Sequence, residues 1–402
     1  MTRMRIVFFM FLSFLPYVLY GRDSLAEIIV YSEMQRNPEP CYIDRKDALK
    51  WEYTGGLEIG AMLDVYDACG DERIREYAFQ YIDSFVTANG SIRSYRLEDY
   101  NLDRINSGKL LFRFYDMTGE QRFRNALDLL RFQLHTHPRN GDGGFWHKKI
   151  YPHQVWLDGV YMAVPFLAEY TARFDGGNRE AFADVVNQIL MAARHNHDVR
   201  TGLFRHACDV SRQMGWADPL TGQSRHCWGR ALGWYMMAIV DALPFIPADT
   251  EGRDSVLAVL GRIAEGVERY RDGTTGLWYQ VMDAPEREGN YLESSCSAMF
   301  VYSMLKAVRL GYLPKRYGKL ARHSYRSFLK HFVYYEDTVD IGCNTLRMAS
   351  IGSCCAVAGL SDSRLGTFDY YINEQRRDND PKVIAPFLKA TIEMERKQPR
   401  QH

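Results

Sequence analysis

Apolar residues recur at spacings of three and four along most of the chain, which is the pattern of amphipathic helices. The clearest runs cover residues 57–66, 110–115, 123–134 and 182–193. Turn signals lie between such runs, in the segments DACGDE, DMTGEQ and RFDGGNRE. Glycine with acidic or amide neighbours ends one helix and begins the next. The pattern therefore predicts an almost wholly helical protein built from hairpins with short connections.

A longer kind of connection occurs four times, at residues 89–95, 143–149, 201–207 and 275–281. Each contains a glycine followed by alternating apolar and polar residues, which makes a weak internal repeat. Each leads into a helix start rich in aromatic, small and polar residues: YNLDRINSGKLL, VWLDGVYMA, CWGRALGWYMMA and YLESSCSAMFVY. Hairpins stacked in a ring would gather these starts around a concave site on one face of an α/α toroid. A right-handed superhelix of the same hairpins is the structural alternative.

Composition and charge limit the classes of molecule that the protein is expected to bind. The chain has 50 Lys plus Arg and 50 Asp plus Glu, so no net charge favours nucleic acid or acidic lipid. Aromatic residues make up 13% of the chain, which suits flat ligands such as sugar rings as well as a core. No linker or break in composition divides residues 23–402, so one domain is expected there.

The first 22 residues have the build of a secretory signal. Arg3 and Arg5 precede an apolar run over residues 6–19, in the order that export signals use. The run is shorter than the roughly 20 residues that span a membrane. We therefore expect a periplasmic or secreted protein with no stable membrane association after cleavage. A signal anchor is the alternative.

Cysteines and histidines give no metal signature. The eight cysteines show no C-x-x-C spacing, so we interpret most of them as buried free thiols. The pairs His135/His137 and His195/His197 lack an accompanying framework of carboxylates or cysteines. No metal site is expected.

Two carboxylates stand at corresponding helix starts, Asp103 in YNLDRINSGK and Asp158 in VWLDGVYM. As helix caps they would be ionised, because a helix N-terminus favours negative charge. A general acid must instead hold its proton near neutral pH, which a dry aromatic setting such as that of Trp156 favours. His147 and His206 take matching places in two repeat loops, which favours ligand contact. Paired carboxylates are also the usual equipment of glycoside cleavage, so both roles stay open.

Large aromatic residues and one arginine share these helix starts. Trp156, Trp228 and Trp234 stand beside charged residues, where they could form pocket walls or belong to the core. Arg230 lies between two of them. Its planar guanidinium could bind a ligand carboxylate through paired hydrogen bonds, or form a salt bridge within the protein.

Five long motifs carry a resemblance to a known family. They are YNLDRINSGK, HQVWLDGVYMAVPF, RHCWGRALGWYMMAIVD, NYLESSCSAMFVYSMLKAVRLGYL and DNDPKVIAPFLKATIEME. Over roughly residues 51–395 the chain resembles glycoside hydrolase family 105, the unsaturated rhamnogalacturonyl hydrolases, which are related to the unsaturated glucuronyl hydrolases of family 88. The resemblance implies an all-α (α/α)6 barrel with no metal or organic cofactor. It also implies a small oligosaccharide partner that begins with a 4,5-unsaturated uronic acid, with the unsaturated galacturonyl unit of rhamnogalacturonan as the leading substrate.

The reaction that the resemblance implies is hydration of the C4=C5 double bond. Asp158 matches the family's general acid and base, which protonates C4 and then helps water to add at C5. The hemiketal that forms opens and releases the remaining saccharide. Asp103 matches a second important carboxylate that positions or tunes the first.

The resemblance also marks substrate contacts, residue by residue. They fall on His147, Trp156, His206, Arg230 and Trp234, with Tyr53 as a further match and Trp228 beside them as a pocket wall. Cys227 and Cys296 depart from the family pattern, which bears on sugar preference. Two alternatives remain. One is an inverting glycosidase in which Asp103 and another carboxylate attack the anomeric centre, and the other is a saccharide-binding protein without catalysis.

Overall fold

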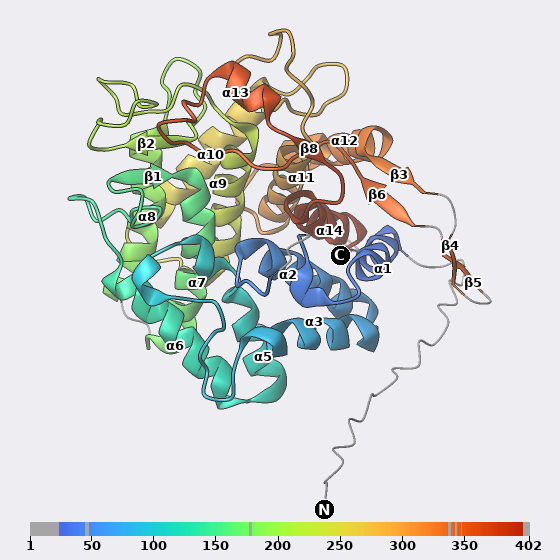
Figure 1. Cartoon of the computed structure of the whole chain (residues 1–402). Helices are drawn as coiled ribbons and strands as arrows, with labels where there is room; N and C mark the ends of the chain where they lie inside the picture. Colours follow the sequence, from blue (N-terminus) through green and yellow to red (C-terminus); the bar gives the residue numbers. More distant parts are fainter. Residues whose placement is uncertain are drawn as a thin grey trace, which may run out of the picture.

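Helices in two concentric layers form the body of the protein (Figure 1). The computed structural model describes residues 24–44, 48–176, 179–336, 339–341, 344–346 and 348–396, so the predicted signal segment lies outside the described residues. The inner layer consists of α2 (Tyr53–Cys69), α4 (Asp103–Asn106) with α5 (Lys109–Thr118), α7 (Leu157–Phe174), α9 (Gly229–Ala242), α11 (Ser294–Arg309) and α14 (Pro381–Glu395). The outer layer consists of α1 (Leu25–Arg36), α3 (Glu72–Phe85), α6 (Gln121–Thr136), α8 (Arg179–Asn196), α10 (Arg253–Arg269) and α12 (Lys315–Phe332).

The inner layer is a closed ring. Each inner helix contacts the next one along the chain, and α14 returns to contact α2. Each inner helix also packs against one outer helix, and Figure 1 shows α1 beside α14, which joins the two ends of the described chain. Six hairpins therefore close into the predicted (α/α)6 barrel, and the superhelix alternative is wrong.

Three inner helices and one outer helix show how composition relates to layer. The inner helix α9 buries every residue except Asp241, and α7 and α11 are also apolar around most of their circumference. In the outer helix α12 the buried residues follow one another at spacings of one, three or four and lie on one face. A helix that is apolar all round must be enclosed, whereas an amphipathic one covers it from outside.

The predicted hairpin turns join inner helices to outer ones. Gly70 ends α2 with φ 74° and Gly119 ends α5 with φ 69°, a left-handed conformation that glycine adopts without a steric penalty. The third predicted turn includes residues 177–178, which lie outside the described residues.

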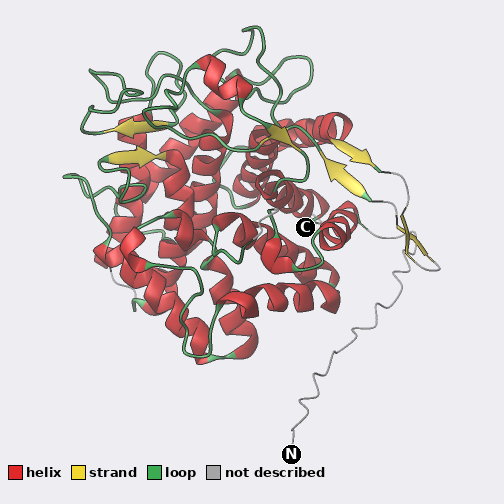
Figure 2. Ribbon diagram, viewed as in Figure 1, coloured by secondary structure: helices red, strands yellow, loops and turns green. Residues whose placement is uncertain are grey.

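The four predicted long connections run the other way, from an outer helix to the next inner one. Antiparallel bridges close the first three, at Val86–Ile92, Arg139–Phe145 and His197–Phe204. The strand β1 (Gln154–Trp156) pairs antiparallel with β2 (Ala207–Asp209), which ties two of these connections together. Figure 2 shows the long loops gathered at one end of the ring, where the inner helices begin. We call this end the mouth.

Several short helices and strands were not indicated by the spacing of apolar residues. They are η1 (Pro40–Tyr42), η2 (Leu97–Asp99), η3 (Leu243–Phe245), α13 (Phe368–Asn373), β3 (Val333–Tyr335) paired with β6 (Ala349–Ile351), β4 (Val339–Ile341) paired with β5 (Asn344–Leu346), and β7 (Cys354–Cys355) paired with β8 (Arg376–Arg377). Most of the strands lie between α12 and α14. Strands of two or three residues are too short to show an alternating pattern.

Two features of the described residues bear on cysteine chemistry and membranes. Seven cysteines are free thiols and five of these are buried, as predicted, while Cys343 lies outside the described residues. Among the helices that the structure describes, none combines the length and the apolar character needed to cross a membrane.

Candidate active site at the mouth of the ring

Asp158 is the second residue of α7, and its carboxylate does not cap that helix. The side chain is 15% exposed, and its Oδ2 lies 3.3 Å from Nε2 of the fully buried His206. The contact does not have hydrogen-bond geometry, and neither atom has another hydrogen-bond partner among the described residues. Buried polar atoms are nearly always hydrogen-bonded. Two unsatisfied atoms facing each other therefore mark this point as a candidate for ligand contact.

His206 is held from its other side by Tyr371. The Nδ1 of His206 lies 2.8 Å from the hydroxyl of Tyr371, which comes from α13. Burial raises the pKa of Tyr371 well above its ordinary value, so the hydroxyl keeps its proton and can donate to Nδ1. A histidine that accepts at Nδ1 carries its proton at Nε2, and this is the nitrogen that faces Asp158.

Asp103 is the first residue of α4 and has a cationic partner. Its Oδ2 lies 2.6 Å from Nζ of Lys148, and its Oδ1 lies 3.6 Å from Nε2 of His147. Burial raises the pKa of Asp103, but the nearby Lys148 and His147 outweigh it and hold the pKa below the ordinary value. Asp103 is therefore ionised at neutral pH and does not serve as a proton donor.

His147 is buried and neutral. Burial lowers its pKa to about 4, although the negative charge of Asp103 opposes this. The backbone of the loop is fixed by a bridge from Lys148 to Asn101. Gly159 lies next to the imidazole of His147, and a Cβ atom at Gly159 would come within 2.8 Å of Nδ1 of that imidazole. Glycine at this position in α7 lets the imidazole pack directly against the helix.

Aromatic rings connect the two aspartates. Trp156 stacks on His147 with 4.8 Å between ring centroids and on Tyr151 with 5.3 Å. His206 meets the same indole edge-on at 5.1 Å and lies 4.7 Å from the ring of Trp228. The neighbours of both carboxylates thus belong to one packed aromatic group.

Arg230, at the second position of α9, is 2% exposed. Its guanidinium lies over Trp228 at 4.6 Å and donates to the carbonyl of Cys355. Its Nε has no hydrogen-bond partner in the described part of the chain. Arg230 is thus anchored by a backbone carbonyl in place of the salt bridge that the sequence left open, and its Nε–H remains an unused donor.

Trp234 lies more than one turn into α9, and the half-buried Tyr53, which begins α2, packs against it. Trp234 is 1% exposed, and its ring stacks on Tyr161 at 4.8 Å. Tyr53 meets Trp234 edge-on at 6.3 Å, and burial raises the pKa of this tyrosine well above its ordinary value. Tyr161 follows Asp158 by about one helical turn. These rings therefore form a floor beneath the mouth.

The structure brings most of the predicted site residues into one connected group at the mouth. Direct contacts link Asp103, His147, Trp156, His206, Asp158, Trp228 and Arg230, and Tyr53 with Trp234 lies below them. Lys148, Tyr151 and Tyr371 were not predicted. Lys148 directly follows a predicted histidine and could have been found from that position. Tyr371 lies 165 residues from its partner, and no local pattern connects them.

Comparison with known proteins identifies the family. Residues 25–398 match the family model described as Glycosyl Hydrolase Family 88. The chain belongs to this family. A solved glycoside hydrolase from family 105 of C. acetobutylicum ATCC 824 is 36% identical, with a TM-score of 0.85 over 93% of this chain and 99% of that one. The predicted relation to families 105 and 88 is therefore confirmed, and this family 88 chain is a glycoside hydrolase.

Two further relatives of this family 88 member are more distant. The unsaturated rhamnogalacturonyl hydrolase YesR of Bacillus subtilis (strain 168) is 25% identical over 274 residues, which is 65% of this chain and 72% of that one. The unsaturated glucuronyl hydrolase of Bacillus sp. GL1 has 16% identity and a TM-score of 0.65, over 92% of this chain and 95% of that one. The second likeness concerns the fold alone.

Proposed function

We propose that this glycoside hydrolase removes a 4,5-unsaturated uronic acid from the non-reducing end of a small oligosaccharide by hydrating the C4=C5 bond. The observation that carries the proposal is the contrast between the two aspartates. Asp103 is neutralised by Lys148, whereas Asp158 meets the imidazole of His206 and has an oxygen without a hydrogen bond. Asp158 is thus the carboxyl group that is left to exchange a proton with a substrate.

The chemistry assigned to Asp158 needs one group in two protonation states. The protonated carboxyl gives its proton to C4, and the positive charge that develops is shared between C5 and the ring oxygen. The carboxylate then takes a proton from water as the water oxygen bonds to C5. The hemiketal at C5 opens to a ketone and releases the rest of the saccharide. Each cycle returns the proton to Asp158.

The surrounding groups support these steps. An Nε2 proton on His206 would orient the carboxylate of Asp158 after it has given up its own proton. Asp103, held in place by Lys148, would fix the position of His147 beside Trp156. The guanidinium of Arg230, which lies over Trp228, supplies a positive charge that suits the uronate carboxylate.

We further propose unsaturated galacturonyl-rhamnose as the substrate. The support is the relation to family 105 and the similarity to YesR, an unsaturated rhamnogalacturonyl hydrolase. Export to the periplasm or to the outside, directed by residues 1–22, would place the enzyme where products of polysaccharide lyases arise.

Paired unsaturated and saturated disaccharides test the reaction class. Hydration removes the ultraviolet absorbance of the conjugated double bond and acts on the unsaturated sugar alone. An inverting glycosidase based on Asp103 would cleave the saturated disaccharide as well and would leave the absorbance unchanged at first. A panel with unsaturated galacturonyl and unsaturated glucuronyl ends, ranked by kcat/KM, tests the substrate. Faster turnover of the glucuronyl sugars would contradict the proposal that unsaturated galacturonyl-rhamnose is the substrate.

A further inference from the structure

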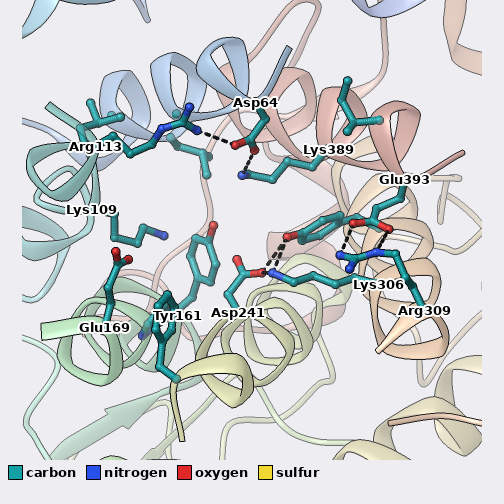
Figure 3. A pocket seen from close by; sticks show the side chains of 18 of the residues that line it. Asp64, Lys109, Arg113, Tyr161, Glu169, Asp241, Lys306, Arg309, Lys389 and Glu393 are labelled. Atoms are coloured by element: carbon teal, nitrogen blue, oxygen red, sulfur yellow. Dashed lines mark hydrogen bonds and ion pairs between the residues drawn. The ribbon is translucent and has the colours of Figure 1, made fainter. Parts of the chain in front are cut away.

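A cavity lies inside the ring, and Tyr161, one of the rings of the floor, forms part of its wall (Figure 3). Its volume is about 320 Å³ and side chains from α2, α5, α7, α9, α11 and α14 line it. Small-molecule sites usually measure roughly 300–1,000 Å³. Its wall residue Glu169 follows Asp158 on α7 by about three turns, roughly 16 Å. We call this space the axial cavity, and it is separate from the mouth.

Charged side chains line the axial cavity, and most of them are paired. Ion pairs join Asp64 to Arg113 and Lys389, Asp241 to Lys306, Glu393 to Arg309 and Arg396, and Glu169 to Arg173 just outside the wall. Figure 3 shows these groups arranged around an open centre. Paired charges of this kind need no ligand.

Lys109 differs from the other charged wall residues. Among the residues that the structure describes, no carboxylate lies within 4.0 Å of its Nζ, which instead lies 3.9 Å from the ring centroid of Tyr161. Burial lowers the pKa of Lys109 to about 7. Lys109 is half-buried, and an ammonium partly removed from water without a counter-charge is costly. Figure 3 shows the side chain directed into the space between the paired groups.

We propose that the axial cavity binds a small hydroxylated monocarboxylate, about the size of one sugar ring, with its carboxylate on Lys109. One unpaired cation calls for one negative charge. The hydroxyl groups of such a ligand would meet the carboxylates of Glu169 and Asp241 as acceptors and the hydroxyl of Tyr161 as a donor. Tyr161 is 1% exposed, and its hydroxyl makes no hydrogen bond within the described part of the chain.

The charges around Lys109 give the site a pH dependence. Glu169 and Asp241 favour its protonated form, whereas Lys306 and Lys389 oppose it. The other charged wall residues are paired: Arg113 with Asp64, and Arg309 and Arg396 with Glu393. A bound carboxylate stabilises the ammonium, so binding takes up a proton wherever Lys109 is partly neutral. Affinity should therefore fall as the pH rises from 6 towards 9.

Calorimetric titration of the full chain with D-galacturonate tests the proposal, with D-galactose and inorganic phosphate as comparison ligands. Lys109→Met removes the cation, and Lys315→Met is the matched control because Lys315 is exposed on α12. We expect galacturonate to bind the wild type and the control, and to lose about 10- to 100-fold in affinity to K109M. Equal affinity for K109M would overturn the proposal. So would equal binding of galactose, or binding of phosphate alone.

Two further measurements test the role of Lys109, one on the stability of K109M and one on the wild type alone. K109M should melt a few degrees above the wild type, because it loses a buried unpaired charge, and a lower melting temperature would contradict that account of Lys109. In the wild type, titrations near pH 8 in buffers of different ionisation enthalpy should show proton uptake when galacturonate binds. Absence of uptake would overturn the proposal. The proposed function at the mouth does not depend on either result.

Discussion

Asp103 lies 2.6 Å from the ammonium of Lys148, whereas Asp158 faces the imidazole of His206 at 3.3 Å. Both residues were predicted from the same pattern, an aspartate after an apolar residue at a helix start. Their different partners come from loops that the pattern does not place. The sequence could therefore predict the pair of carboxylates, but not which one is neutralised by a cation.

Replacement of the proposed acid, Asp158, should reduce the rate of catalysis and leave substrate binding intact. Asp158→Asn keeps the shape of the side chain but removes the proton that C4 must receive. We expect kcat to fall by about 10²–10⁴-fold, with substrate binding retained in a calorimetric titration. Asp103→Asn should bind less well, because it leaves Lys148 and His147 without their carboxylate. A D158N enzyme with more than a tenth of wild-type kcat would contradict the assignment.

Tyr371 is expected to act by positioning His206. Tyr371→Phe removes the hydroxyl that lies 2.8 Å from Nδ1 of His206, and with it the group that selects the tautomer. One hydrogen bond contributes about 0.5–1.5 kcal/mol, so kcat should fall roughly 2- to 10-fold, the pH profile should shift, and KM should change little. Tyr370→Phe is the control, because its hydroxyl accepts from the backbone of Gly359. A loss in Y371F seen in KM alone would contradict the positioning role.

The depressed pKa of His147, about 4 in the folded protein against 6.5 ordinarily, gives a stability prediction. The neutral form is favoured by folding, so the contribution of His147 is present above pH 6.5 and is lost as the pH falls towards 4. His147→Gln cannot be protonated. The free energy of unfolding of the wild type, relative to H147Q, should therefore decrease between pH 6.5 and 4 in urea titrations. A difference in the free energy of unfolding between the wild type and H147Q that does not change with pH would refute this prediction.

At the scale of elements, the helical ring could be predicted because its period and its turn signals repeat along the chain. Gly70 and Gly119 end inner helices as the turn segments indicated, and the four long connections all lead to the mouth. The region between α12 and α14 could not be predicted in this way. Its strands have only two or three residues, and β7 is held by a partner about twenty residues away, as in the pairing of Cys355 with Arg376.

The close packing of α7 against the loop of His147 should make the protein sensitive to a larger side chain at Gly159. Gly159→Ala would place Cβ within 2.8 Å of Nδ1 of His147, so we expect a loss of about 1–3 kcal/mol in stability and lower kcat. Gly261→Ala in α10 is the matched control, since nothing lies within 4 Å of its added Cβ. That variant should gain roughly 0.5–1 kcal/mol from helix propensity. Equal thermal shifts in the two variants would contradict the packing argument.

At the scale of the whole molecule, the ring brings together residues from α4, α7, α9, α13 and the loops between them at one end. The resemblance to family 105 named most of the residues that meet at this end, and the match of residues 25–398 to Glycosyl Hydrolase Family 88 shows that the chain is a glycoside hydrolase. Neither the family nor the local pattern pointed to the axial cavity, because its walls come from six helices that are adjacent only when the ring is closed.

The central claim is that this enzyme breaks its substrate by adding water across C4=C5, with the proton supplied at C4. Nuclear magnetic resonance of the product formed in deuterated water tests it most directly. Hydration predicts one deuterium at C4 of the released acid, a ketone at C5 and no remaining double bond. Release of a sugar that still holds its C4=C5 bond and carries no deuterium at C4 would contradict the account.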